Sequence, residues 1–268
     1  MSLDRETRLT IFHLYRRDGS AIFLHPFQKP ESFLSFDERT RVTGKYGREP
    51  EVENIIAFRD ELYRAVDTAV RRSVADSRFL TNLLLSAGTF LLLYFVFTFG
   101  VRDPIPMLDE ILLSLGITAV LHIRRTRKDQ KRPQARELQK KLREKVDNIE
   151  FNQAPFVKEV EELLHRYEAV DPRRLFDFFF QGEEMALDQD DLNDARQLLA
   201  YLDRYFSGKK YRRQRRSIDQ LSKSGGLAGK KLKDLESPQG LASMDLSLYF
   251  TYKSLEKLYH QRMENQKV

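Results

Sequence analysis

The sequence of 268 residues contains no cysteine, which excludes a disulfide framework, thiolate metal ligands and a cysteine nucleophile. Its first ten residues, MSLDRETRLT, also lack the apolar core of a signal peptide. Hydrophobic residues make up 41% of the chain and charged residues 32%, which is ordinary for a soluble protein. The apolar residues are unevenly distributed, however, so we expect any route to a membrane to depend on an internal segment.

One long segment has no charge. Phe79–Val101 holds 23 uncharged residues, which as a helix would span about 34 Å, enough for a hydrocarbon core of about 30 Å. The alternative is a fully buried helix in the core of a soluble protein. Eighteen or more uncharged, mainly apolar residues are the usual signature of a transmembrane helix, which we therefore predict here.

A second apolar segment is shorter and carries two acids near its start. Residues 111–123 are 13 charge-free residues, and extension to Met107 gives 17 residues that include Asp109 and Glu110. In one interpretation 107–123 spans the membrane, and the acids lie in the first helical turn at the far interface, where the helix dipole favours negative charge. In a second the acids lie deeper and face a polar cavity or an oligomer axis. In a third the segment is re-entrant or lies on the membrane surface.

Basic residues flank both segments on the sides that a hairpin would bring together. Three arginines precede the first segment, and the second is followed by Arg124, Arg125, Arg127, Lys128, Lys131 and Arg132. The connection, residues 102–106, holds one arginine and one aspartate. Since basic residues prefer the cytoplasmic side, the sequence favours a two-helix transmembrane hairpin, 79–101 and 107–123, over a single span. It places the protein in the cytoplasmic (inner) membrane with both termini in the cytosol.

Charge alternates along the rest of the chain. Residues 124–145 hold 11 basic and 3 acidic residues, 146–208 hold 6 and 15, and 209–268 hold 14 and 6. A basic block directly after a membrane span meets anionic lipid headgroups, so we expect the six basic residues that follow the second segment to bind the membrane surface. Nucleic acid is not an expected partner, because no recognition motif accompanies the charge.

The predicted N-terminal cytosolic region, residues 1–78, combines a β-hairpin with a helix. The runs RLTIFHLY and AIFLHPF enclose Asp18-Gly19 and predict two antiparallel strands. Residues 28–50 have the composition of a loop, and the apolar spacing from Glu51 onward predicts a helix that leads into the first span. His13 and His25 would face opposite sides with a two-residue turn, or the same side with a three-residue turn, so they are weak metal candidates.

After the membrane the signals are helical. Residues 124–208 predict a helical cytosolic domain, with amphipathic helices beginning after Pro133, after Pro155 and near Leu192. Residues 209–240 are rich in basic residues, Gly and Ser and predict a flexible linker, and 241–268 predict a C-terminal amphipathic helix. The expected class is therefore a mainly α membrane protein whose amphipathic helices bind one another, a partner protein or a second copy.

Patterns that resemble catalytic motifs fail on their spacing. Residues 224–231 lack the first glycine and the final hydroxyl of a phosphate-binding loop, and residues 188–192 lack the glycine of a calcium loop. We expect no cofactor, no metal and no enzymatic activity. The sequence favours a membrane-anchored adaptor or scaffold, and the alternative is an oligomeric cation pore with Asp109 and Glu110 around its entrance.

Overall fold

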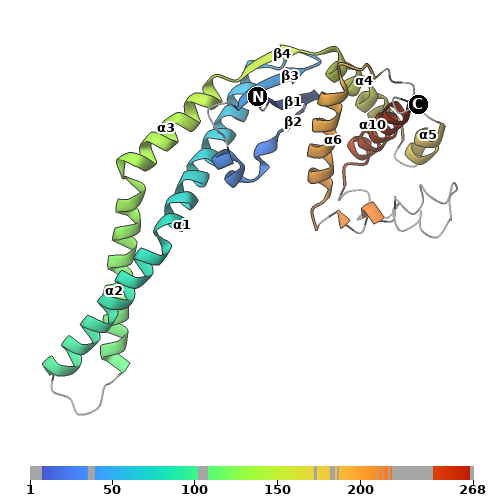
Figure 1. Cartoon of the computed structure of the whole chain (residues 1–268). Coiled ribbons are helices and arrows are strands. Elements are labelled where there is room, and N and C mark those ends of the chain that lie inside the picture. Colours follow the sequence, from blue (N-terminus) through green and yellow to red (C-terminus); the bar gives the residue numbers. More distant parts are fainter. Residues whose placement is uncertain are drawn as a thin grey trace. The chain divides into compact units, whose positions relative to one another are not determined.

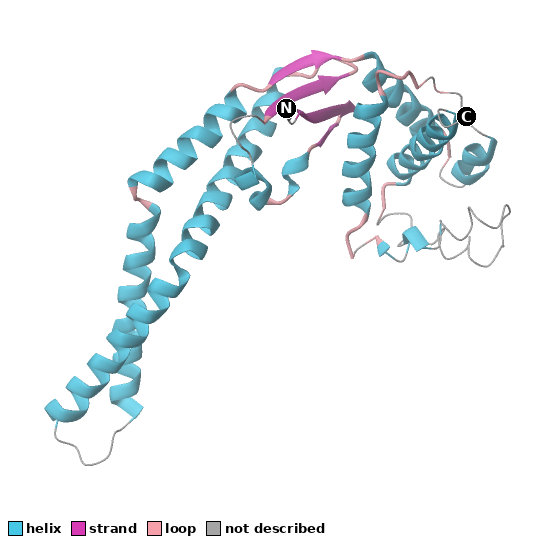
Figure 2. Ribbon diagram, in the orientation of Figure 1, coloured by secondary structure: helices cyan, strands magenta, loops and turns pink. Residues whose placement is uncertain are grey.

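The computed structural model describes residues 8–35, 40–101, 108–171, 174–181, 185, 187–209, 211–212, 214–216, 218 and 244–265. Over these residues the protein is mainly helical, as predicted, and contains one small mixed sheet (Figure 2). The chain divides into two compact units. Residues 1–26, 39–58 and 149–268 form the first, and residues 27–38 and 59–148 form the second.

The sheet of the first unit has four strands in the order β2-β1-β3-β4. The predicted hairpin is confirmed, because β1 (Arg8–Tyr15) pairs antiparallel with β2 (Ala21–Leu24). On its other side β1 runs parallel to β3 (Arg41–Tyr46), which in turn runs parallel to β4 (Glu150–Gln153). The sheet therefore joins strands from the predicted N-terminal region to one from the predicted helical domain.

The prediction that residues 28–50 form a loop is wrong, because β3 is an interior strand of the sheet. Gly44 suggested a loop, but it pairs with Phe151, and an added Cβ would lie 2.5 Å from Cε1 of that ring. At Gly47 an added Cβ would lie 2.5 Å from the Cα of Lys158. At both glycines the backbone lies very close to a neighbouring element, which leaves no room for a side chain, so neither glycine marks a turn. Two short 3₁₀ helices, η1 (Pro26–Gln28) and η2 (Pro30–Ser35), precede β3.

One face of the sheet is covered by helices that the apolar stripes predicted. α4 (Pro155–Ala169) and α6 (Leu192–Phe206) pack on β1, and α10 (Leu246–Asn265) packs on both helices. The short helix α5 (Leu175–Gln181), which the sequence analysis did not predict, contacts α10. Pro155 occupies the first turn of α4, as expected. Phe12, Leu14 and Leu24 contribute the sheet's share of this core.

The opposite face of β1 is buried beneath aromatic rings. Phe23 stacks on Phe58 with ring centroids 4.1 Å apart, and His13 meets the edge of Phe23 at 4.8 Å. His25 lies 5.4 Å from Phe58, so both histidines border the same cluster. The register pairs His13 with Phe23 across a five-residue connection, and this odd loop length puts both histidines on one face. Burial on both faces explains why β1 lacks the alternation of a half-exposed strand.

The second unit consists mainly of long helices. α1 (Val52–Val101) is continuous for 50 residues, which confirms that the predicted helix leads directly into the first apolar segment. Its first residues belong to the first unit and the remainder to the second. α2 (Leu108–Gln130) returns antiparallel beside α1, and α3 (Pro133–Asp147) follows (Figure 1). Pro133 begins α3 after the extended residue Arg132, so the predicted helix break is confirmed.

The structure describes little of the predicted linker but most of the predicted C-terminal helix. The linker, 209–240, lies largely outside the described residues, and short helical turns occupy 212, 214–216 and 218 at its start. The predicted C-terminal helix is present as α10.

Candidate membrane hairpin

Six polar residues of α2 recur along one face of the helix. They are spaced by three or four residues, which places them in one stripe, and they are Glu110, Ser114, Thr118, His122, Arg125 and Asp129. From first to last the stripe extends over about 28 Å of helix. We call it, with its partners on α1, the polar seam.

Four hydrogen bonds join the polar seam to α1. They are Thr98 Oγ1 to Glu110 Oε2 at 3.1 Å, Arg125 Nη2 to Thr89 Oγ1 at 3.4 Å, Ser86 Oγ with His122 Nδ1 at 2.9 Å, and Asn82 Nδ2 to Asp129 Oδ2 at 3.1 Å. Glu110, near the start of α2, bonds to Thr98 near the end of α1, whereas Asp129, near the end of α2, bonds to Asn82, as an antiparallel pair requires. These bonds fix the register of the two helices along the whole hairpin.

The seam is buried between the helices over much of its length. Glu110, Ser114, Thr118 and Asp129 are all at most 9% exposed. The hydroxyls of Ser114 and Thr118 have no hydrogen-bond partner among the described residues. Buried polar groups without partners cost free energy, so the middle of the seam is its least satisfied part.

The outer surface of the helix pair is apolar. In the apolar segment of α1 the exposed large apolar residues are Phe79, Leu80, Leu83, Leu84, Leu85, Leu91, Leu92, Phe95, Val96 and Phe99. On α2 they are Leu108, Ile111, Leu112, Leu113, Leu115, Val120 and Ile123. A helix pair in water buries its apolar stripe and exposes its polar residues. This pair does the reverse, an arrangement suited to surrounding hydrocarbon.

By length and composition, α1 is the one helix among the described residues that could cross a membrane. None of its most apolar stretch is buried inside the protein. This exposed surface separates α1 from the core helix of a soluble protein, which would be covered.

The two acids at the start of the second segment lie in the first turn of α2, as the first interpretation expected. Glu110 is directed at α1, where Thr98 of the same chain donates a hydrogen bond to it. The side chain of Asp109 lies outside the described part of the structure. Its role as an ion-facing group therefore stays a prediction.

The six basic residues after the second segment divide into two groups. Arg124, Arg127, Lys128 and Lys131 are exposed and form no ion pair with any described residue. The other two are engaged with the hairpin: Arg125 donates to Thr89, and Arg132 forms an ion pair of 2.8 Å with Asp129. Four of the six predicted lipid-binding side chains are thus available on the surface.

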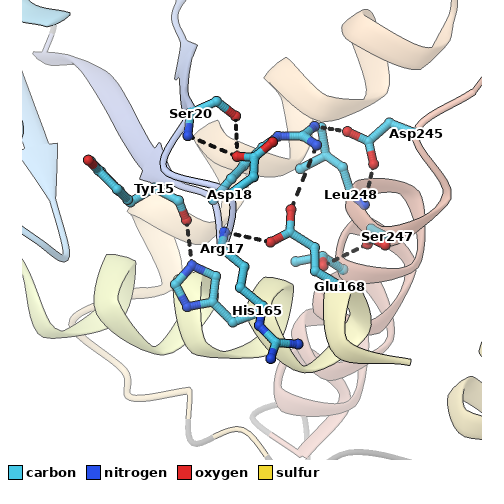
Figure 3. A network of polar contacts seen from close by, with 11 residues as sticks. Tyr15, Arg17, Asp18, Ser20, His165, Glu168, Asp245, Ser247 and Leu248 are labelled. Atoms are coloured by element: carbon cyan, nitrogen blue, oxygen red, sulfur yellow. Dashed lines mark hydrogen bonds and ion pairs between the residues drawn. The ribbon is translucent and has the colours of Figure 1, made fainter. Parts of the chain in front are cut away.

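In the first unit, polar contacts fasten the β1–β2 connection to the helices (Figure 3). The carboxylate of Asp18 accepts hydrogen bonds from the amide and hydroxyl of Ser20, at 2.8 and 2.7 Å, and closes the turn. Glu168 of α4 accepts a bond of 2.8 Å from the amide of Arg17. Arg16 pairs with both Glu168 and Asp245, the residue just before α10.

Two further residues of α4 bind backbone at the ends of the strands. His165 Nε2 donates to the carbonyl of Tyr15 at 2.8 Å (Figure 3). Glu161, 3% exposed, accepts the amides of Tyr15 at 3.0 Å and Arg48 at 2.9 Å. Burial raises the pKa of the Glu161 carboxyl, and hydrogen bonds from the amides of Tyr15, Arg48 and Gly47 act against that rise. The sequence analysis missed Glu161, because its partners are distant along the chain.

The histidines and acids of the first unit contact backbone and neighbouring rings. Within the described residues, no three His, Asp or Glu side chains are grouped so that they could hold a metal ion. Burial lowers the pKa of both His13 and His25 to about 4, which keeps these rings neutral at pH 7. The Nε2 of His165 is bound to the backbone carbonyl of Tyr15.

Comparisons with protein-family models, with curated proteins and with solved structures gave no match for this chain.

Proposed function

We propose that this chain is a non-enzymatic integral membrane protein that holds its first unit at the cytoplasmic face of the inner membrane. In this proposal α1 and α2 both cross the bilayer, from Phe79 to Val101 and from residue 107 to Ile123. The first unit is the adaptor, and it binds a protein partner or a second copy through its helical surface.

The observation that carries the proposal is the distribution of polarity on the helix pair. The polar seam of α2 is turned toward α1, while most of its leucines and isoleucines are exposed. In hydrocarbon each unsatisfied polar group costs several kcal/mol, so polar side chains turn inward and apolar ones outward. In this respect α2 matches α1, although its apolar run is shorter.

Flanking charge supports the orientation. Arg71, Arg72 and Arg78 precede the apolar part of α1, and Arg124, Arg127 and Lys128 lie toward the end of α2. An antiparallel pair brings these two clusters to the same side, and the positive-inside rule assigns that side to the cytosol.

Glu110 weighs against the alternative of a cation pore. A ring of carboxylates that selects cations presents them to a shared aqueous path. Glu110 is instead 9% exposed and accepts a hydrogen bond from Thr98 of its own chain. The carboxylate thus has a partner without any oligomer.

Because the chain has no cysteine, topology can be tested with single cysteines. Asp103→Cys would lie between the two spans, and Ser207→Cys in the exposed end of α6. A membrane-impermeant maleimide added to intact cells should label the first and should label the second only after permeabilisation. Labelling of both from the same side would refute the hairpin. Release of the chain by alkaline carbonate would refute membrane integration altogether.

A second assay addresses the pore. We expect proteoliposomes of the wild-type chain to show no cation flux above empty vesicles. Flux that is abolished by Asp109→Asn together with Glu110→Gln would overturn the adaptor and establish the pore.

A further inference from the structure

A cavity of about 410 Å³ lies in the second unit, where the chain passes from α2 to α3. It is bordered by α1 on one side and by residues around the helix break on the other. The break arises at Arg132, whose backbone is extended (φ −63°, ψ 151°) because Pro133 follows it. The sequence thus creates a gap where a continuous helix would have filled the space.

Two cations line this cavity without a carboxylate partner. Arg71 uses only its Nε, which donates to the carbonyl of Asp67 at 3.2 Å, so its two terminal amino groups are free among the described residues. Lys131 forms no ion pair or side-chain hydrogen bond with the described part of the chain. Two unpaired cations in the lining of one cavity, one from α1 and one from the connection between α2 and α3, favour an anion there.

The single acid of the cavity is already neutralised. Both carboxylate oxygens of Asp67 lie 2.9 Å from Nη2 of Arg143, and Gln139 Nε2 donates to one of them at 2.7 Å. Asp67 therefore does not compete for Arg71 or Lys131. The remaining polar group of the lining, the amide of Gln130, adds a hydrogen-bond donor.

The apolar part of the cavity lining is formed by Val70 and Val74. Val70 is 6% exposed, so it offers only a small apolar surface. A cavity lined by both cations and valines suits an anion that is attached to a less polar group.

The position along the helices identifies the anion. Arg71 precedes the apolar segment of α1 by eight residues, and Lys131 follows Ile123 by eight, about 12 Å of helix in each case. Long basic side chains at helix ends reach back toward the bilayer interface. In the proposed hairpin both cations therefore approach the layer of lipid headgroups from the cytoplasmic side.

We propose that this cavity binds the phosphodiester of an anionic phospholipid headgroup from the cytoplasmic leaflet. Arg71 and Lys131 contact the phosphate oxygens, and Val70 and Val74 lie against the glycerol end of the lipid. The inference rests on the proposed membrane hairpin and goes further, because it assigns one specific site for one lipid in place of a diffuse basic surface.

A neighbouring cavity of about 450 Å³ along α3 provides a contrast. It is lined by three basic residues and by Glu144 and Asp147, and its Arg143 is already paired with Asp67. Acids and bases there nearly balance, so that cavity gives an anion no comparable attraction.

The test measures lipid retention by the full chain. The protein is extracted in mild detergent, mixed with equal amounts of phosphatidylglycerol and phosphatidylethanolamine, and examined by native mass spectrometry. The test variant is Arg71→Gln with Lys131→Gln. The matched control is Arg136→Gln with Lys140→Gln, which removes the same charge from exposed positions that line the neighbouring cavity. We expect wild type and control to retain one phosphatidylglycerol, and the test variant to bind it about tenfold or more weakly.

Two results would overturn the proposal. Equal losses in test variant and control would show a diffuse electrostatic surface, and equal retention of both lipids by wild type would show no preference for an anionic lipid. Competition distinguishes a lipid headgroup from free phosphate as the ligand. We expect glycerophosphoglycerol and inorganic phosphate to displace the lipid poorly, because they lack acyl chains. Displacement by inorganic phosphate at equal concentration would assign the cavity to free phosphate instead.

Carbonate extraction of the same variants separates this inference from the proposed function. Membrane retention without lipid specificity would defeat the lipid site and leave the membrane anchor intact. Release of wild type into the soluble fraction would defeat the anchor and the lipid site together.

Discussion

The hydroxyl of Thr98, near the end of α1, donates a hydrogen bond of 3.1 Å to the carboxylate of Glu110 in the first turn of α2. The acid that interrupts the second apolar segment thus has a partner on the adjacent helix. At the other end of the hairpin, Asn82 donates to Asp129 in a corresponding way. Polar residues at both ends of the helix pair are satisfied between the helices.

A double-mutant cycle of Thr98→Val and Glu110→Ala should show that these residues are coupled. Interhelical hydrogen bonds in membranes contribute about 0.6 kcal/mol on average and about 1.7 kcal/mol at most, so we expect a coupling in that range. The measurement is the free energy of unfolding during titration with a denaturing detergent. A control cycle of Thr98→Val with Thr126→Val, at the opposite end of the hairpin, should give a coupling near zero. Equal values in the two cycles would mean that the bond adds no stability.

The buried histidines should make the first unit sensitive to acid. Burial lowers the pKa of His13 and His25 to about 4, whereas an unfolded histidine titrates near 6.5. The unfolded chain therefore binds protons first as the pH falls. The stability contribution is complete above pH 6.5 and is lost between pH 6.5 and 4, by about 3 kcal/mol per histidine at most.

The check is the pH dependence of thermal unfolding in wild type and in His13→Leu. The variant should lose stability less steeply between pH 6.5 and 4, while His260→Leu, at an exposed position of α10, should match wild type. The pKa of Glu161 is raised, so its effect on stability as the pH falls is opposite to that of the histidines. The informative quantity is therefore the difference in stability between His13→Leu and wild type at each pH. Parallel curves for wild type and His13→Leu would disprove the role of this histidine.

Gly44→Ala should destabilise the sheet, because the new methyl group would overlap the ring of Phe151. Overpacking of this kind costs about 1–3 kcal/mol. In a Phe151→Ala background, Gly44→Ala should cost less stability than it does in wild type, because the obstructing ring is then absent. Gly88→Ala is the control, because an added Cβ there meets nothing within 4 Å. The measurement is the melting temperature of each purified variant, and additive losses for Gly44 and Phe151 would contradict the steric account.

Glu161→Ala should weaken the attachment of α4 to the ends of β1 and β3. It would leave the buried amide of Tyr15 and the partly buried amide of Arg48 without their acceptor, and a buried unsatisfied group costs about 1–3 kcal/mol. Glu161→Gln keeps one carbonyl oxygen and should lose less. Hydrogen exchange of the Tyr15 and Arg48 amides should accelerate in the order wild type, Gln, Ala. A uniform acceleration across α4 in place of this local pattern would show general unfolding.

The sequence by itself determined the features that depend on neighbouring residues. The uncharged run Phe79–Val101, the helix starts at Pro133 and Pro155, and the hairpin around Gly19 each result from local propensity or from the period of the apolar pattern. The backbone at Gly19 has φ 88°, which glycine adopts without strain, so this turn was visible in the sequence. The stripe of polar residues on α2 is also a local pattern.

Tertiary structure alone decided which distant segments meet. β3 and β4 are parallel strands more than a hundred residues apart, and parallel pairing leaves no turn signal between its strands. Gly44 therefore resembled a loop residue until Phe151 was placed against it. In the same way, Glu110 and Asp129 lie on one face of α2, but only packing against α1 gave them Thr98 and Asn82 as partners. Local sequence fixes the conformation of each element, whereas the choice of partner depends on burial and hydrogen bonding summed over the folded chain.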